Sequence, residues 1–336
     1  MNILVTGATG FIGSHTCVAL QNEGHHVIAF DNFYNSKESV IEKIETITGK
    51  KFVFYKADMT VPEDLEKIFS ENSIDCVIHF AGYKAVGESV EIPLDYYRNN
   101  IYGTLCLLET MKKYNVKRII FSSSATVYGK PASLPIREDF PLSVTNPYGR
   151  TKLMIEEILR DLWISDHAWS IILLRYFNPV GAHKSGLLCE DPKGIPNNIV
   201  PRILDVAFAK TPYITVYGDD YHTKDGTGVR DYIHVADLAY GHVKALDYLI
   251  SHTSVEAVNL GTGTGYSVFE LIRAFEENNS IRIPYKVCPR RAGDIDACYA
   301  DPSKAKALFG WQAAYGLDDM CKDAYQARKK LEEAQL

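Results

Sequence analysis

Tyr148 and Lys152, four residues apart, are the pair in this sequence with the plainest chemical use. Asn146 and Pro147 are typical of a helix N-cap and first helical position, and apolar residues recur beyond them at helical spacing. On one helix face the lysine ammonium would favour the tyrosine phenolate. We therefore expect Lys152 to lower the pKa of Tyr148, which becomes a general acid and base near neutral pH. Such a pair also occurs by chance on many helices, so the rest of the chain must decide.

A glycine-rich turn near the N-terminus predicts a dinucleotide site. An apolar run at residues 3–5 is followed by Gly7, Gly10 and Gly13 and then by a helical pattern. Glycines let the backbone approach a pyrophosphate, which a helix N-terminus also favours. Asp31 follows about 20 residues on, where an acid accepts from a ribose 2′-hydroxyl and repels a 2′-phosphate. The expected cofactor is therefore NAD rather than NADP.

Strand-like and helical patterns alternate through the first half of the chain. After the strands at 3–5 and 26–30, we expect strands at 51–55, 75–80, 118–122 and 171–174, and helices at 62–71 and 94–114. This alternation predicts an α/β fold, a Rossmann-like doubly wound parallel sheet. Ligands bind such sheets at the carboxyl ends of the strands. Asp31, Asp58, Gly82, Ser124 and the start of the Tyr148 helix all fall at that edge.

The regular alternation ends after residue 177, and loops rich in glycine and proline follow. We expect an NAD-binding domain at 1–177, including the Tyr148 helix, and a smaller substrate-binding lobe at 178–336. Segments around 230–262 should return to the main domain, because residues 258–260 have a strand pattern.

Composition sets the broad class. The chain has 336 residues, is 46% hydrophobic and carries a net charge of -6, so nucleic acid is not an expected partner. Its 7 cysteines are scattered, which favours neither disulfides nor a metal site and is consistent with the cytoplasm. We expect neither a signal peptide nor a membrane span.

Several stretches together resemble the extended short-chain dehydrogenase/reductase family. The glycine turn, Ser124 and the Tyr148–Lys152 pair are its shared marks. Within it, the chain is most similar to the UDP-glucose (UDP-galactose) 4-epimerase family. The stretches that carry this closer resemblance, across residues 1 to about 310, are 79–82, 84–89, 121–129, 174–182 and 228–234.

The resemblance implies a reaction and a set of site residues. In that family C4 of a UDP-hexose gives a hydride to tightly held NAD⁺, the tyrosine takes the 4-hydroxyl proton, and the 4-keto sugar turns over before reduction. Tyr148, Lys152 and Ser124 would be catalytic. The implied cofactor-binding residues are Gly7, Gly10, Phe11, Ile12, Gly13, Asp31, Asn32, Asp58, Met59, Phe80, Ala81, Gly82, Lys84, Asn99, Ser122, Tyr148, Lys152 and Phe177. The implied UDP-sugar-binding residues are Lys84, Ser124, Thr126, Tyr148, Asn178, Asn198, Ile199, Thr215, Val216, Tyr217, Arg230, Arg291, Asp294 and Cys298.

Plainer interpretations of these residues stay open. Lys84 could be a surface lysine, Asn99 could bond only to backbone, Phe177 could be a core aromatic, and Arg230 could pair with Asp231. The arginines Arg230 and Arg291 do have the fork geometry that suits a pyrophosphate.

The resemblance also bears on substrate range and assembly. Family members restricted to UDP-glucose and UDP-galactose have a tyrosine at the position of Cys298, whereas a small residue leaves room for an N-acetyl group. We therefore expect activity on N-acetylated UDP-hexoses, unless the neighbouring Tyr299 fills the pocket instead. A homodimer is expected through helices 94–114 and 147–164, each with an apolar stripe.

Two other functions compete with epimerisation. Nucleotide-sugar dehydratases of the same superfamily carry an Asp-Glu pair just after the first serine or threonine of the catalytic strand. This chain has Ser124-Ala125 there and no carboxylate. A non-catalytic NAD-binding protein on the same fold is the second. The intact Ser124, Tyr148 and Lys152 argue against it.

Overall fold

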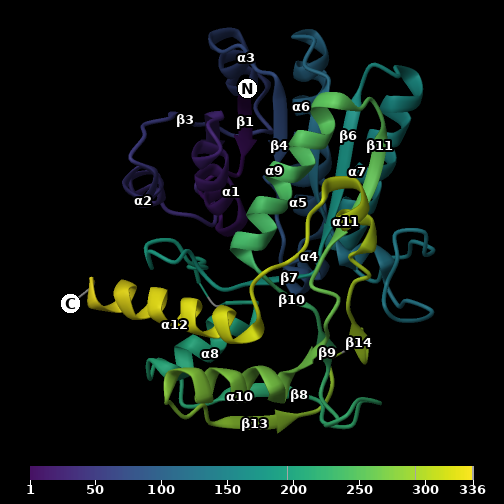
Figure 1. The fold of residues 1–336 in the computed structure, drawn as a ribbon. Helices are drawn as coiled ribbons and strands as arrows, with labels where there is room; N and C mark the ends of the chain where they lie inside the picture. Colours follow the sequence, from purple (N-terminus) through teal and green to yellow (C-terminus); the bar gives the residue numbers. More distant parts are fainter. Residues whose placement is uncertain (195, 292, 335–336) are drawn as a thin grey trace.

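A parallel sheet of seven strands forms the centre of the larger lobe in the computed structural model, which describes residues 1–194, 196–291 and 293–334. The strand order is β11-β6-β5-β4-β1-β2-β3 (Figure 1). The strands are β1 (Asn2–Thr6), β2 (His26–Asp31), β3 (Val53–Lys56), β4 (Cys76–His79), β5 (Arg118–Ser124), β6 (Ser170–Tyr176) and β11 (Val255–Leu260). The predicted Rossmann-like α/β fold is confirmed.

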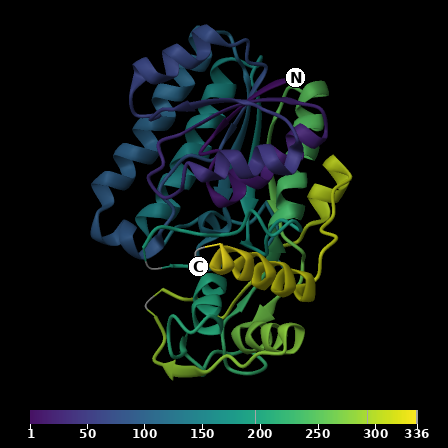
Figure 2. The ribbon, with the colours of Figure 1, turned by 90° about the vertical axis from the view of Figure 1, so that its left-hand side faces the viewer.

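Helices cover both faces of this sheet, so the strands are buried on both sides. Figure 2 shows α9 in green on one side and the blue helices on the other. One apolar cluster packs the first face with α1 (Phe11–Asn22), α2 (Ser39–Thr48), α9 (Val235–Ser251) and α11 (Ser303–Phe309). A second cluster packs the opposite face with α3 (Pro62–Glu71), α6 (Gly103–Lys113) and α7 (Pro147–Ser165).

The segment expected as one helix at 94–114 is interrupted by a wider turn. The structure has α5 (Pro93–Tyr96), a π-helix η1 (Tyr97–Tyr102) and then α6, preceded by the short α4 (Val86–Glu91). The π-helix turns Asn100 inward, where its side-chain amide bonds Tyr83 and the Thr151 hydroxyl of α7. Such π-turns are common at functional sites. This one joins the loop after β4 to the helix that carries Tyr148.

The smaller lobe lies at the carboxyl edge of the main sheet (Figure 1). Its core holds apolar side chains from the strand β8 (Ile214–Tyr217) and from three helices, α8 (Ile199–Ala207), α10 (Val268–Asn279) and α12 (Leu317–Glu333). A second strand, β13 (Tyr285–Cys288), pairs with β8 but is mostly exposed. Shorter strands lie between the lobes: β7 (Asn178–Val180) pairs with β10 (Tyr232–His234), and β9 (Val229–Arg230) pairs with β12 (Tyr266–Ser267) and β14 (Ala297–Cys298).

The chain crosses between the lobes more than once. β11 pairs with β6 over its whole length, and α9 and α11 pack on the main sheet although they follow residue 177. The division into domains at residue 177 stays a prediction. Among the described residues, every helix is too short or too polar to cross a bilayer.

Candidate active site

The N-terminus of α7 places Tyr148 at the carboxyl edge of the sheet. The Asn146 side chain accepts a hydrogen bond of 2.8 Å from the Gly149 N–H, and Pro147 occupies the first turn, as predicted. This N-cap satisfies an amide that would otherwise lack a helical partner. Tyr148 is half-buried, whereas Lys152 one turn later is buried. The N-cap sequence therefore determines where the helix begins and so where the Tyr148 side chain lies.

The end of β5 supplies the other side of this site. Lys152 Nζ donates a 2.6 Å hydrogen bond to the carbonyl oxygen of Ser122, two residues before Ser124. The Ser124 side chain is close enough to Tyr148 to influence its pKa. The Thr126 hydroxyl is buried and has no partner among the described residues. Ser122, Ser124, Thr126, Tyr148 and Lys152 thus come together, as predicted.

The expected effect of Lys152 on Tyr148 is wrong for this structure. Burial raises the pKa of Tyr148, and the Ser124 side chain offsets this only in part. Burial also lowers the pKa of Lys152 to about 7. The Lys152 Nζ atom lies 5.9 Å from the centre of the Tyr148 ring and 4.8 Å from that of Phe121, and its hydrogen bond goes to Ser122. The lysine ammonium is therefore directed at the end of β5, and burial decides the direction in which the pKa of Tyr148 moves.

A buried ion pair that sequence reasoning missed holds α7 against β5 and β6. Arg175 donates to both oxygens of Glu156 at 2.9 and 2.6 Å, and each side chain is 1% exposed. The Ser123 hydroxyl donates to the same carboxylate. Glu156 follows Tyr148 and Lys152 at four-residue spacing, so all three lie on one face of α7. In the sequence, the only signal for Glu156 was its position four residues after Lys152, on the same face of the helix.

The turn between β1 and α1 has the shape a dinucleotide needs. Gly7 has a φ of +65°, and a Cβ there would lie 2.8 Å from the Ala81 nitrogen. A Cβ on Gly13 would lie 2.3 Å from the Gly7 oxygen. No side chain caps α1 at Gly10, and its first turn has no acidic residue. The N-terminal amides of α1 therefore face a space in which an anion would be stabilised. The residues present fit the pyrophosphate of NAD.

The carboxylates expected to bind the adenosine end lie beside this turn. Asp31 ends β2 and accepts from the Thr9 amide at 3.1 Å, the Phe33 amide at 2.8 Å and the Ser36 hydroxyl at 3.1 Å. Because a carboxylate has about four acceptor positions, it can take one more donor, such as a ribose hydroxyl.

Asp58 lies nearby, after β3, and accepts from Asn32 at 2.8 Å. Burial raises the pKa of Asp58, but hydrogen bonds from Asn32 and Thr60 outweigh burial and leave it below its ordinary value. Asn32 and Asp58 thus form one polar pair at this end of the site.

The remaining residues predicted to bind the cofactor are spread along the sheet edge. Phe80, Ala81 and Gly82 follow β4, and the Ala81 amide donates to Thr6 at 3.0 Å. The Asn99 amide donates to Asn100 rather than only to backbone. Met59 is buried, and its side chain lies where a Cβ on Gly103 would go. Phe11 and Ile12 open α1.

The arginines of the smaller lobe share one carboxylate. Arg291 Nε donates to Asp294 at 3.0 Å, and Arg230 Nη2 lies 3.9 Å from the other oxygen of Asp294. The Arg291 guanidinium lies 5.0 Å from the centre of the Tyr217 ring. Asp231 instead accepts from Thr262, Gly263 and Ala300. The alternative pairing of Arg230 with Asp231 is therefore wrong.

Cys298 ends β14 and Tyr299 follows it, and the two side chains pack in different places. Cys298 packs against an apolar cluster that contains Val127 and Phe177. The Tyr299 ring lies beside Gly265, where a Cβ would be 3.0 Å from it. Cys298 is also paired in register with Arg230. The small residue, and not the tyrosine, therefore faces the lobe boundary near Phe177.

Two of the residues predicted to bind the sugar nucleotide have side chains that are largely buried in or against the core of the smaller lobe. Val216 is 1% exposed in the core of the smaller lobe, and Ile199 packs against the same core. Asn178 is exposed at the start of β7, and Thr215 lies in β8. Any contact of Val216 with a ligand would therefore come from its main chain.

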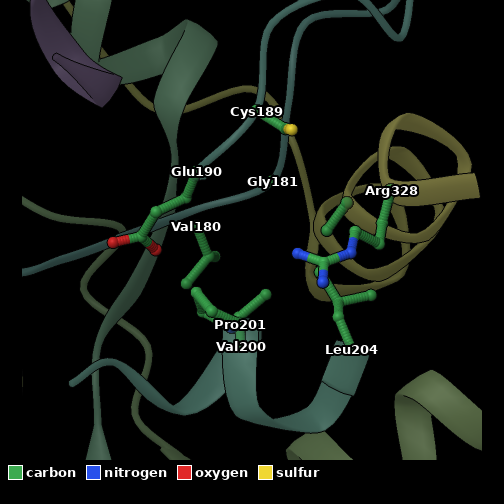
Figure 3. Close-up of a pocket in the computed structure, with 9 residues that line it drawn as sticks. Val180, Gly181, Cys189, Glu190, Val200, Pro201, Leu204 and Arg328 are labelled. Atoms are coloured by element: carbon green, nitrogen blue, oxygen red, sulfur yellow. The ribbon is translucent and has the colours of Figure 1, made fainter. Parts of the chain in front are cut away.

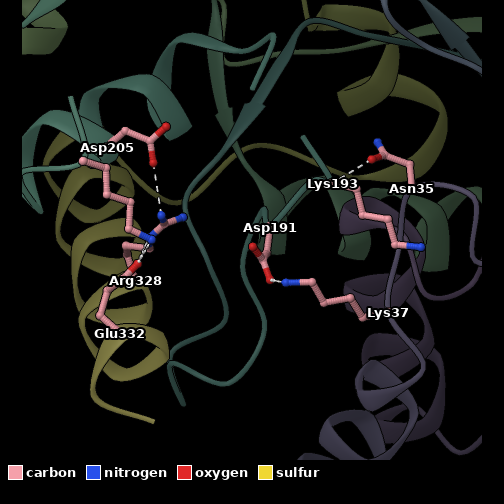
Figure 4. A network of polar contacts seen from close by, with 8 residues as sticks. Asn35, Lys37, Asp191, Lys193, Asp205, Arg328 and Glu332 are labelled. Atoms are coloured by element: carbon pink, nitrogen blue, oxygen red, sulfur yellow. Dashed lines mark hydrogen bonds and ion pairs between the residues drawn. The ribbon is translucent and has the colours of Figure 1, made fainter. Parts of the chain in front are cut away.

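Glu190 was missed by sequence reasoning and joins two predicted binding residues. Its Oε1 atom accepts from Lys84 Nζ at 3.1 Å and from Asn198 Nδ2 at 2.5 Å. Figure 3 shows Glu190 and Arg328 on opposite sides of a small pocket lined by Val180, Val200 and Pro201. Arg328 bonds Asp205 and Glu332 instead (Figure 4). Glu190 therefore belongs with Lys84 and Asn198.

The sheet, the glycine turn and the Ser124, Tyr148 and Lys152 set define an extended short-chain dehydrogenase/reductase. A family model described as GDP-mannose 4,6 dehydratase matches residues 4–324. A UDP-glucose 4-epimerase of Bacillus subtilis is 57% identical over 97% of this chain and 96% of its own length. The chain therefore belongs to the UDP-glucose 4-epimerase family.

Solved structures agree with this placement. The UDP-glucose 4-epimerase of Bifidobacterium longum, in complex with NAD⁺ and UDP, has a TM-score of 0.96 at 55% identity, covering 98% of each chain. A UDP-Glc/GlcNAc 4-epimerase from Campylobacter jejuni has a TM-score of 0.85 at 36% identity, covering 98% of this chain and 99% of its own.

Proposed function

We propose that this protein interconverts UDP-galactose and UDP-glucose at C4 through a 4-keto sugar, with NAD as its cofactor. The observation that carries this is the meeting of Tyr148, Ser124 and Lys152 at the sheet edge, beside a glycine turn that fits a dinucleotide. The reaction is a reversible oxidation and reduction at one carbon. It needs one acid/base group near that carbon and no second carboxylate.

Each residue has a distinct task in this reaction. Tyr148 takes the proton of the 4-hydroxyl and later returns it, and Ser124 bonds the same oxygen. Lys152 lies one turn along α7 from Tyr148 and holds the end of β5 through the Ser122 carbonyl. A bound nicotinamide supplies the hydride acceptor and donor.

The dehydratase named in the matching family model is the competing activity. Elimination of water across C5 and C6 requires an additional acid and base beside C5 and C6. Ala125 follows Ser124 here, and it has no proton to give. Epimerisation is therefore the activity that this site supports best.

A single assay separates the candidates. The purified protein with bound NAD is mixed with UDP-galactose, and the products are followed by chromatography. Epimerisation gives UDP-glucose, dehydration gives a 4-keto-6-deoxy sugar nucleotide, and a non-catalytic protein leaves the substrate unchanged. Either of the last two results would overturn the proposal.

N-acetylated UDP-hexoses are a second proposed substrate class. Cys298 lies beside Phe177, and the bulky Tyr299 turns toward Gly265. A cysteine is much smaller than the tyrosine it stands in place of, and this difference in size supports acceptance of an acetamido group. The Campylobacter jejuni relative, described as acting on Glc and GlcNAc forms, is consistent with this range.

We further propose that the protein is a homodimer in a reducing compartment, the cytoplasm. Leu94 on α5 is 80% exposed and Ile164 on α7 is 65% exposed, and Tyr102 and Leu105 are exposed as well. Burying this surface in a two-fold assembly would remove apolar area from water. Sedimentation should give a dimer at micromolar concentration, and L94E/L105E should give a monomer.

The cysteines bear on the compartment. All 7 cysteines are free, which suits a reducing compartment.

A further inference from the structure

We infer that Glu190 is a positioning residue that sets Lys84 and Asn198 for the cofactor and the sugar nucleotide. This inference rests on the proposed function, which assigns those two residues to binding. Glu190 itself is not among the residues that the sequence resemblance implies. Its case comes from two hydrogen bonds to its carboxylate, from its burial and from the contacts of the segment that follows it.

The Glu190 carboxylate is shared by donors from both lobes. Lys84 follows β4 of the main sheet, and Asn198 is the N-cap residue of α8 in the smaller lobe. Both donate to the same oxygen, Oε1, at 3.1 and 2.5 Å. Lys84 and Asn198 share one acceptor atom, so a movement of the Glu190 carboxylate with one donor also moves the acceptor of the other. Glu190 therefore ties the two predicted binding sites together.

Burial makes this carboxylate dependent on its donors. The Glu190 side chain is 8% exposed, whereas Lys84 is 50% exposed. A buried carboxylate needs charge or hydrogen bonds in place of water. Lys84 supplies the charge, and in return its long flexible side chain is held in one position. Asn198 lacks a side-chain hydrogen bond to its own helix, so its amide is oriented by Glu190.

The residues after Glu190 tie the same segment to the adenosine end of the site. The Lys193 amide donates to the Asn35 side chain at 3.0 Å (Figure 4). Lys193 Nζ donates to the Phe33 carbonyl at 2.5 Å. Asn35 and Phe33 follow Asp31, which ends β2. The chain that follows Glu190 is thus attached to the loop after β2. This attachment restricts the position of the Glu190 carboxylate.

The test is Glu190→Gln, with Asp191→Asn as the matched control. Gln keeps the size and an acceptor oxygen but removes the charge that holds Lys84. Asp191 is the next residue and pairs with Lys37 (Figure 4). The two side chains are 44% and 25% exposed, more than Glu190, so loss of this pair should matter little. We expect Glu190→Gln to weaken UDP binding, measured by calorimetry, by roughly ten- to hundredfold and to speed loss of NAD on dialysis. Asp191→Asn should remain close to wild type in both.

A double-mutant cycle separates positioning from a general structural effect. On a Lys84→Met background, Glu190→Gln should change kcat/KM for UDP-galactose much less than it does alone, and most of the single-variant loss should be in KM. Equal factors in both backgrounds, or equal losses in Glu190→Gln and Asp191→Asn, would overturn the inference. UDP and NAD binding do not require turnover, so they test Glu190 even if the wild type fails to convert UDP-galactose. That failure would count against the proposed function alone.

Discussion

At the scale of single residues, Tyr148 is the group whose task is most sharply defined. Tyr148→Phe should lower kcat by more than about a hundredfold, because the proton-transferring oxygen is lost while the ring still fills its place. NAD content and the thermal midpoint should stay near wild type. Near-normal turnover by this variant would refute the role of Tyr148.

Cys298 decides the substrate range in the proposed function. Cys298→Tyr should lower turnover of UDP-N-acetylglucosamine by about ten- to a hundredfold or more and spare UDP-galactose, since overfilling a packed site costs on the order of 1–3 kcal/mol or more. Cys298→Ser, which keeps the space open, is the control and should retain both activities. If the wild type turns over UDP-galactose but not UDP-N-acetylglucosamine, the volume argument fails.

The residue scale also shows where sequence reasoning stopped. The N-cap at Asn146 and the Gly7 turn were predictable because their signals are local. The direction of the Tyr148 pKa was not, because it depends on burial, which the local sequence does not show, and the lysine's hydrogen bond goes to a carbonyl 30 residues away. Glu190 was missed for the same reason, since its lysine lies 106 residues away in the sequence.

At the scale of elements, the main sheet and its helices were predictable because apolar periods mark them strongly. The π-turn at Tyr97–Tyr102 was not, since a single wider turn barely changes the apolar pattern. Its effect is tertiary: it brings Asn100 to Tyr83 and Thr151. The helix α2 was also not anticipated, although its apolar side buries Ile44.

The contribution of the ion pair between Glu156 on α7 and Arg175 on β6 to stability can be tested. Glu156→Gln leaves the buried Arg175 without a carboxylate and should lower the free energy of unfolding by about 3–5 kcal/mol. Urea titration measures this loss. Replacing both partners, as E156L/R175M, should recover part of it because no buried charge is left. A double variant less stable than Glu156→Gln would contradict this account.

At the scale of the whole molecule, buried histidines set the response to acid. Burial lowers the pKa of His15 and His79 to about 3 and that of His242 to about 4. Below the ordinary value near 6.5 the unfolded chain takes up protons that the folded chain refuses, so the free energy of unfolding falls as pH falls. Each histidine contributes a slope approaching about 1.4 kcal/mol per pH unit.

His79→Gln isolates one of these contributions. His79 lies between the hydroxyls of Thr6 and Thr104, and Gln can keep one of these bonds. Urea titrations at pH 7, 6 and 5 should give a shallower decline in the variant than in the wild type. Parallel declines would mean that His79 is protonated in the folded protein.

The pairing of β6 with β11 limits how this chain can be divided by protein engineers. All seven residues of β6 are buried, and β11 comes from the C-terminal half of the chain. A gene fragment ending at residue 177 would encode the glycine turn and the tyrosine helix but leave β6 as a bare edge strand. Such an edge invites association with other chains. The cofactor half and the substrate half therefore cannot be exchanged between relatives as separate cassettes. A chimera must also take its last strand and α9 from the same parent.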